Sequence, residues 1–187
     1  MAQLTEKDKM IAGQLYRSSD DLLRNERKRA RRLLKVFNDS LPDETGKRAG
    51  ILKELLNALG QRAEIEPPFY CDYGYNISIG DNFYANFNCV ILDCAKVTIG
   101  DNVFMGPNVQ IYTATHPLAV EERNKGLEAA KPIIIEDSVW ICGGVIINPG
   151  ATIGKGTTIG SGSVVTRDIP PDVFAGGNPC KVIRNLA

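Results

Sequence analysis

A repeat of six residues is the feature that most constrains the fold of this chain. From Val97 the sequence reads VTIGDN, VFMGPN and VQIYTA, and from Ile133 it continues as IIIEDS, VWICGG, VIINPG, ATIGKG, TTIGSG and SVVTRD. Neither an α-helix nor an ordinary strand has a period of six. A prism of three short flat faces does, if each face turns one aliphatic side chain inward and successive coils stack at the parallel-strand spacing of ~4.8 Å. The third place of every hexad is aliphatic, as this arrangement requires: Ile99, Met105, Ile111, Ile135, Ile141, Ile147, Ile153, Ile159 and Val165.

A looser set of hexads, ISIGDN, FYANFN and CVILDC, precedes the regular ones and predicts that the repeat begins near Ile77. Glycine and asparagine at the corners allow backbone angles that other residues resist. The pattern resembles that of hexapeptide-repeat proteins, and the resemblance implies a left-handed parallel β-helix, which breaks the usual right-handed crossover rule. The expected fold is therefore mainly β, with an N-terminal helical cap and a protruding loop.

Residues 1–60 differ in kind from the repeat and predict a helical segment packed on the β-helix. Apolar residues at near-helical spacing indicate one or more helices before residue 40 (Ile11, Leu15, Leu22, Leu23, Leu33, Leu34, Val36 and Phe37) and a further helix ended by Gly60 (Ile51, Leu52, Leu55, Leu56 and Leu59). Residues 61–187 are expected to form the β-helix with a loop at 112–132 and a C-terminal tail.

Composition excludes several classes of function. The 22 basic and 22 acidic residues balance, so no global field favours nucleic acid or a membrane surface. The basic run from Arg24 to Lys35 lacks interleaved aromatic residues and is interpreted as a solvated helix face. Five cysteines without a CxxC pair indicate reduced thiols, and the charged start together with the lack of a long apolar stretch predicts a cytoplasmic protein without a membrane span.

The hexads fail between Ile111 and Ile133, and this interruption contains His116, the only histidine of the chain. Long loops inside compact repeats are usually functional. An imidazole titrates near neutrality and can take a proton from an attacking hydroxyl or amine, so His116 is the candidate general base. The alternative is an ordinary surface histidine. One histidine in a lateral loop argues against a zinc site shared by three subunits, and no metal is expected.

Three stretches, CDYGYNISIGDNFYANFNCVILD, IYTATHP and GGNPCKVIRNL, resemble the maltose and galactoside O-acetyltransferases of the hexapeptide-repeat class. The resemblance implies direct transfer of an acetyl group from acetyl-CoA to a sugar hydroxyl, expected to be the primary 6-hydroxyl, without an acetyl-enzyme. In this resemblance His116 matches the base, Asn86 matches a residue that contacts and positions the acceptor, and Asp72 and Asp93 lie on the acceptor side.

Some positions depart from the galactoside enzymes. Ser18 and Cys94 stand where those enzymes have acidic residues, and Asp72 stands where they have a serine. These differences favour maltose or glucose as acceptors over galactosides. Galactosides and other hydroxyl or amine acceptors, such as an antibiotic, stay open as alternatives, and so does a non-enzymatic scaffold or nucleic-acid adaptor.

The resemblance also implies where acetyl-CoA binds and how the chain assembles. Arginine and lysine can pair with the phosphates, and small residues let the pantetheine arm lie against the backbone. Trp140 could flank that arm or pack on a neighbouring subunit, and backbone N–H groups near 142–144 could hold the oxyanion. The family places its sites between the subunits of a homotrimer. The matching cofactor positions are Gly143, Ser161, Thr166, Arg167, Lys181 and Arg184.

Overall fold

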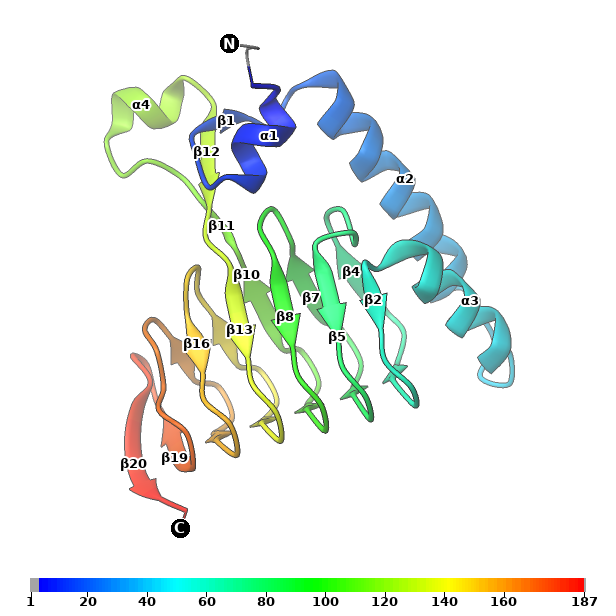
Figure 1. Ribbon diagram of the computed structural model, residues 1–187, viewed down its shortest axis with the longest axis vertical. Coiled ribbons are helices and arrows are strands. Elements are labelled where there is room, and N and C mark those ends of the chain that lie inside the picture. Colours follow the sequence, from blue (N-terminus) through cyan, green and yellow to red (C-terminus); the bar gives the residue numbers. More distant parts are fainter. Residues whose placement is uncertain (1–3, 187) are drawn as a thin grey trace.

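The computed structural model describes residues 4–186 and contains a three-faced β-helix capped at one end by helices (Figure 1). Each face is a parallel sheet that takes one strand from every coil. The first face holds β2 (Ala58–Leu59), β5 (Ile77–Ile79), β8 (Val97–Ile99), β13 (Ile133–Ile135) and β16 (Thr152–Ile153). The second holds β3 (Glu64–Ile65), β6 (Tyr84–Ala85), β9 (Phe104–Met105), β14 (Trp140–Ile141), β17 (Thr158–Ile159) and β19 (Val173–Gly176). The third holds β4 (Phe69–Cys71), β7 (Cys89–Leu92), β10 (Gln110–Tyr112), β15 (Ile146–Ile147) and β18 (Val164–Val165).

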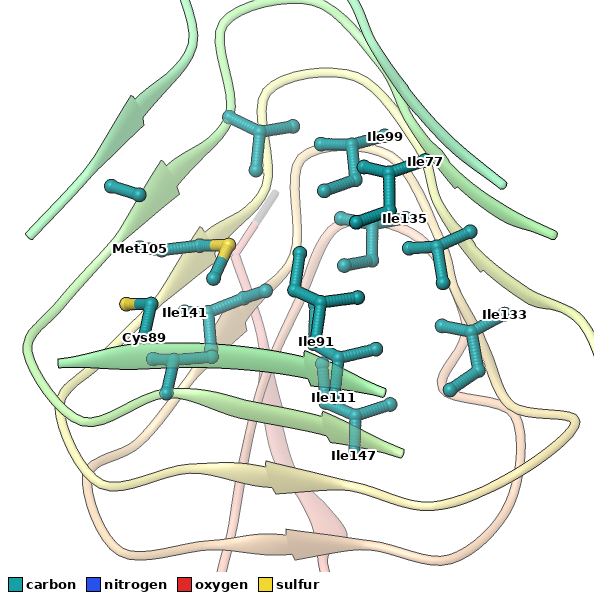
Figure 2. Packing of buried hydrophobic residues seen from close by; sticks show 14 of the residues in the cluster. Ile77, Cys89, Ile91, Ile99, Met105, Ile111, Ile133, Ile135, Ile141 and Ile147 are labelled. Carbon is teal, nitrogen blue, oxygen red and sulfur yellow. The ribbon is translucent and has the colours of Figure 1, made fainter. Parts of the chain in front are cut away.

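The third place of each hexad points into the prism, as the sequence predicted. All nine of these side chains are at most 2% exposed. Equivalent residues lie directly above one another, so that Ile99, Ile135 and Ile153 form one ladder across β8, β13 and β16. Figure 2 shows Ile99 and Ile135 of this ladder, with Ile111, Ile141 and Ile147 of the other two faces, pointing into the coil. Burial of this continuous aliphatic column is the main stabilising contribution to the β-helix.

Two hexad positions are fixed by backbone geometry. The sixth place has a positive φ in most hexads, for example 55° at Asn82 and Asn102, where asparagine tolerates the left-handed region. The fourth place is often glycine because successive coils approach closely there. A Cβ on Gly80 would lie 2.3 Å from the Asp101 carboxylate and 2.7 Å from the Gly100 carbonyl carbon.

The repeat begins earlier than Ile77, and the expectation on this point was wrong. One complete coil, β2 to β4, precedes it, and Leu59, Ile65 and Cys71 occupy the third places. The pattern is hard to detect in this coil because two prolines end the hexad AEIEPP and a cysteine replaces the aliphatic residue of the next.

The cap contains α1 (Glu6–Ile11), α2 (Asp21–Asn38) and α3 (Thr45–Leu55). Asp20 caps α2 by accepting a hydrogen bond from the Leu23 N–H. Buried residues of α2 and α3 join the core of the β-helix (Ala30, Leu34, Phe37, Leu52 and Leu55). The helix expected to reach Gly60 ends at Leu55, and Leu59 belongs to β2. Four residues of the predicted apolar pattern face outward instead of inward: Ile11, Leu15, Leu22 and Val36.

The loop at 112–132 has its own structure. It contains β11 (Ala114–Thr115), α4 (Val120–Asn124) and β12 (Leu127–Ala130), and β12 pairs antiparallel with both β11 and β1 (Tyr16–Arg17). The cap therefore holds the loop above the β-helix (Figure 1).

Strand β20 (Lys181–Asn185) folds back antiparallel along β19 and ends the second face. All five cysteines are free, as predicted, and four of them are buried. No helix within residues 4–186 has the length and apolar character needed to cross a membrane.

Candidate active site

His116 follows β11 and has an exposed imidazole with one fixed ring nitrogen. Its Nδ1 lies 3.2 Å from the carbonyl oxygen of Leu127 on the neighbouring strand β12. Because a carbonyl oxygen only accepts, this contact favours the tautomer of the neutral imidazole in which Nδ1 carries the proton and Nε2 is the acceptor. The backbone of β12 thus orients one ring nitrogen of the imidazole.

The imidazole lines a cavity of about 310 Å³, here called the His116 cavity, between the loop, α2 and the third face of the β-helix. Asp72, which the sequence placed on the acceptor side, lies in this cavity, together with Ser18 and Cys94. The full lining is Ser18, Arg27, Arg31, Asp72, Tyr73, Leu92, Cys94, Ala114, His116 and Glu128. Acidic, basic and hydroxyl groups thus meet around the candidate base, a set that can both donate to and accept from a hydroxylated ligand.

Glu128 is a residue of this cavity that the sequence analysis missed. The Ser18 hydroxyl donates to one of its carboxylate oxygens at 2.6 Å, and the Tyr16 hydroxyl donates to the other at 3.0 Å. Glu128 directly follows Leu127, whose carbonyl orients His116. No motif marks Glu128, since its position depends on the pairing of β1 with β12 across the fold.

Arg27 corrects the interpretation of the basic run as a solvated face. Its guanidinium donates at 2.5 Å to the Tyr73 hydroxyl and at 2.6 Å to the Ser18 carbonyl. These bonds connect α2 to the floor of the cavity. Arg31, one turn further along α2, lines the same cavity. The remaining basic residues of the run are exposed, as expected.

Asp72 and Asp93 have different positions, although both were expected to contact the acceptor. Asp72 is partly exposed in the cavity, and burial raises the pKa of its carboxyl above the ordinary value. Asp93 is fully buried and does not line the cavity. Its carboxylate accepts backbone N–H bonds from Asp72, Tyr73 and Gly74 at 2.7–3.0 Å, with a longer one of 3.4 Å from Asn76.

These bonds mean that Asp93 holds the turn that carries Asp72, and direct contact with a ligand is not its role in this structure. Burial raises the pKa of the Asp93 carboxyl to about 7, while the backbone donors oppose the rise. Cys94 lies beside Asp72, with Sγ 3.7 Å from a carboxylate oxygen, and burial raises the pKa of its thiol to about 12.

Asn86 lies elsewhere on the chain, at the corner between the second and third faces. It lines a separate cavity of about 430 Å³ with Tyr84, Phe104 and Trp140, and its side-chain oxygen accepts from the Phe87 N–H at 2.7 Å. Neither His116 nor Asp72 lines that cavity. Within a single chain, the residues expected to act on one acceptor are therefore divided between two cavities.

The expected cofactor positions also form more than one group. Gly143 and Ser161 occupy the same corner in successive coils, where the Gly162 N–H donates to the Gly143 carbonyl at 3.0 Å. Thr166 and Arg167 follow β18 at another corner. Lys181 and Arg184 lie on β20, and the Arg184 guanidinium is 5.9 Å from the centre of the Phe174 ring. The five side chains other than Gly143 are exposed: Ser161, Thr166, Arg167, Lys181 and Arg184.

Of the backbone N–H groups at 142–144, which were the candidate oxyanion donors, two already donate to other backbone carbonyls. The Cys142 N–H donates to Ile159 and the Gly144 N–H to Pro107, both at 2.9 Å, within the coil structure. The Gly143 N–H has no acceptor within residues 4–186. Across the same residues, no group of three or more His, Cys, Asp or Glu side chains gathers in a metal-binding arrangement.

The fold and its two signature segments define a hexapeptide-repeat transferase. Residues 132–167 match the bacterial transferase hexapeptide (six repeats), and residues 9–60 match the maltose acetyltransferase hexapeptide capping motif. Galactoside O-acetyltransferase of Escherichia coli is 47% identical over 96% of this chain and 88% of its own length.

Two solved structures are similar over nearly the whole chain. A maltose O-acetyltransferase from Clostridium difficile 630 superposes with a TM-score of 0.98 at 50% identity and covers 100% of both chains. A galactoside acetyltransferase in complex with coenzyme A superposes with a TM-score of 0.95 at 45% identity, over 99% of this chain and 92% of the other. The chain belongs to the maltose and galactoside O-acetyltransferase family, and it is accordingly an acetyl-CoA-dependent acetyltransferase.

Proposed function

We propose that the protein transfers the acetyl group of acetyl-CoA to a hydroxyl of a small sugar, and that His116 is the general base. The observation that carries this proposal is the contact of His116 Nδ1 with the Leu127 carbonyl, which in the neutral imidazole places the proton on Nδ1 and keeps Nε2 as the acceptor, on a side chain that lines a cavity with hydroxyl-binding groups. Family membership argues against the scaffold and nucleic-acid adaptor alternatives.

The chemistry needs no acetyl-enzyme. Nε2 takes the proton of the sugar hydroxyl as its oxygen attacks the thioester carbonyl carbon. The tetrahedral intermediate then collapses by breaking the C–S bond, and the imidazolium returns the proton to the CoA sulfur. Ester and free CoA are the products. A base in this position contributes roughly 10²–10⁴ to the rate. The unpaired Gly143 N–H is the proposed donor to the oxyanion.

A homotrimer completes the site in this proposal. His116 and Asp72 line one cavity and Asn86 lines another, so an acceptor bound at His116 would meet Asn86 only from a second copy of the chain. The exposed rings of Phe104 and Trp140 beside Asn86, each about half exposed, suit a surface covered by that copy.

Acetyl-CoA is proposed to lie along the later coils, with its phosphates near Arg167, Lys181 and Arg184 and its pantetheine arm against Gly143, Ser161 and Thr166. Charge-assisted contacts to exposed basic side chains suit the nucleotide end. We place the enzyme in the cytoplasm, where free thiols and acetyl-CoA coexist.

The proposed acceptor is a sugar of the maltose or glucose type, acetylated at its primary 6-hydroxyl. Asp72, Ser18 and Glu128 provide acceptors and donors for the remaining hydroxyls. Galactosides and amine acceptors are the alternatives. They would present different groups to Ser18, Asp72 and Cys94, which line the cavity.

Replacing His116 with Ala tests the proposal. The variant should keep its assembly and melting temperature, since the exposed imidazole makes one hydrogen bond, and turnover should fall at least ~10²-fold. Glu122→Ala, an exposed change in the same loop, is the matched control and should keep wild-type turnover. Free thiol release from acetyl-CoA with glucose, maltose, galactosides and amines measures both rate and acceptor. Near-normal turnover of the His116 variant would refute the assignment.

A further inference from the structure

A cavity of about 620 Å³, here called the α3 cavity, lies between helix α3 and the first coil of the β-helix. Residues 45–53 of α3 form one wall, and residues 59–65 at the corner of the coil form the other. Figure 1 shows α3 beside β2 at the capped end of the molecule. The lining shares no residue with the His116 cavity, the Asn86 cavity or the proposed acetyl-CoA positions. We propose that the α3 cavity binds a small organic anion, whose oxyanion group meets the cations of the two walls and whose apolar body covers the floor.

Arg62 is an unusual residue for its place in the coil. The same corner of the five later coils holds a glycine or a short polar residue: Asn82, Asn102, Ser138, Gly156 and Asp172. All of these positions have a positive φ, and φ is 56° at Arg62. Glycine, asparagine and aspartate tolerate this left-handed region better than a long side chain does. Residues held in such a conformation cluster at ligand-binding sites, and the coil itself has no need of an arginine here.

Two cations of the lining have no partner of their own. Lys53 on α3 and Arg62 on the coil form no ion pair or side-chain hydrogen bond within residues 4–186. Arg48, the third basic residue of the lining, donates to the Ser40 hydroxyl at 2.8 Å and lies 3.6 Å from the Glu66 carboxylate, so its charge is already compensated. An oxyanion bound in the cavity would give the two free cations a charge-assisted contact.

Glu64 is the acidic residue of the lining, and it does not offset these cations. The neighbouring Ile65 points into the prism, so the alternation of β3 turns Glu64 to the outer side of the second face, in register with Tyr84. The three basic side chains of the lining outnumber it. The net charge of the walls is therefore positive, which favours an anion over a neutral or cationic ligand.

The floor of the α3 cavity is apolar. Leu52 and Ile65 line it and are each 3% exposed, and the partly buried Leu59 and Ala63 pack against the same core. The volume of about 620 Å³ lies within the ~300–1,000 Å³ of small-ligand pockets. An inorganic ion would leave this apolar surface uncovered. The ligand is therefore expected to carry an aromatic or alkyl group next to its phosphate or carboxylate.

Isothermal titration calorimetry of the assembled enzyme tests this inference, with CoA present at saturation so that the cofactor site is occupied. Phenyl phosphate and benzoate are the probe anions, inorganic phosphate lacks the apolar body, and phenol lacks the charge. We expect one or both probe anions to bind about tenfold more tightly than inorganic phosphate and phenol. The better of the two probes identifies the oxyanion as a phosphate or a carboxylate.

Arg62→Asn separates a ligand site from a structural corner. Asparagine is the residue of the next two corners and tolerates this φ, so the variant should melt at or above the wild-type temperature. Its Kd for the probe anion should nevertheless rise about three- to fivefold, and Lys53→Gln should have a similar effect. Lys28→Gln, which removes an exposed cation of α2, is the matched control and should bind the probe as the wild type does.

The other outcomes overturn the site. They are no binding of either probe anion up to about 10 mM, binding no tighter than that of inorganic phosphate and phenol, or an unchanged Kd in both Arg62→Asn and Lys53→Gln. A lower melting temperature of Arg62→Asn, or dissociation of its assembly on size-exclusion chromatography, would assign Arg62 to the structure instead. Acetyl transfer to sugars does not depend on this cavity, so any of these failures leaves the proposed function in place.

Discussion

The Ser18 hydroxyl donates a 2.6 Å hydrogen bond to the carboxylate of Glu128, 110 residues later in the sequence. The bond joins the helical cap to the loop that carries His116. Tyr16 donates to the second oxygen of the same carboxylate from a fully buried position. The Glu128 carboxylate thus adds two side-chain hydrogen bonds to the backbone pairing of β1 with β12 by which the cap holds the loop.

Glu128→Ala should destabilise the protein and weaken acceptor binding. The buried Tyr16 hydroxyl would lose its partner, which costs about 1–3 kcal/mol, and the cavity would lose one of its two carboxylates. We expect a lower melting temperature together with a higher KM for sugar. Adding Tyr16→Phe removes the orphaned hydroxyl and should restore much of the stability without restoring KM. A double variant as unstable as Glu128→Ala would contradict this account.

Asp93→Asn should be strongly destabilising despite its similar shape. The amide NH₂ would replace one oxygen that faces the backbone N–H groups of 72–76 and would bring a donor against donors. Each buried donor left unpaired costs about 1–3 kcal/mol. Chemical denaturation provides the measurement, with Asp137→Asn at a partly exposed corner as the comparison. Equal stability of Asp93→Asn and the wild type would show that the turn does not depend on the carboxylate.

Two glycine substitutions should have opposite signs. Gly80→Ala places a methyl group 2.3 Å from Asp101 and 2.7 Å from the next coil's backbone, and overpacking of this kind costs about 1–3 kcal/mol. Gly50 lies inside α3 with no atom within 4 Å of an added Cβ, so Gly50→Ala should stabilise the helix by roughly 0.5–1 kcal/mol. Differential scanning calorimetry of the two variants is the check. Tolerance of Gly80→Ala would show that successive coils can separate at that corner.

Neutralising the basic residues at the proposed CoA end should weaken the binding of acetyl-CoA and leave the binding of the sugar unchanged. Arg167→Gln, Lys181→Gln and Arg184→Gln each remove an exposed cation. If each meets a phosphate, KM for acetyl-CoA should rise roughly tenfold per ~1.4 kcal/mol lost, with kcat and the sugar KM little changed. CoA should also raise the melting temperature of the wild type more than that of the variants. Arg32→Gln on the exposed side of α2 is the control, and an equal effect there would count against the assignment.

The period of six was sufficient to predict the prism, its inward ladder and the interruption at 112–132. These follow from local rules, because each hexad repeats the same inward residue and the same corner. The first coil was not predicted from the sequence, because Pro67, Pro68 and Cys71 depart from the hexad pattern. Helix α3 was predicted too long because Leu59 fits a helical spacing but pairs with Ile79 in the first face.

The candidate site was predictable only where a residue type stands out along the chain. His116 is unique, and Asp72 lies in a recognisable motif. Glu128 reaches the same cavity through the pairing of β1 with β12, and Arg27 reaches it through the packing of α2. Neither contact can be predicted from a local sequence pattern. Asp93 lies in the motif too, but its four backbone donors become visible only when the turn at 72–76 is folded around it.

The antiparallel strand β20 also bears on the solubility of the solenoid. A stack of parallel coils has an open edge at each end, to which another chain could add and so start a filament. The helical cap covers the first coil. At the other end β20 occupies the edge of the second face with its direction reversed and carries Lys181 and Arg184, whose charges repel a further strand of the same kind. Terminating the stack and binding the cofactor would then be two functions of one short segment, so a truncation at Gly176 should promote fibrillar polymerisation as well as inactivate the enzyme.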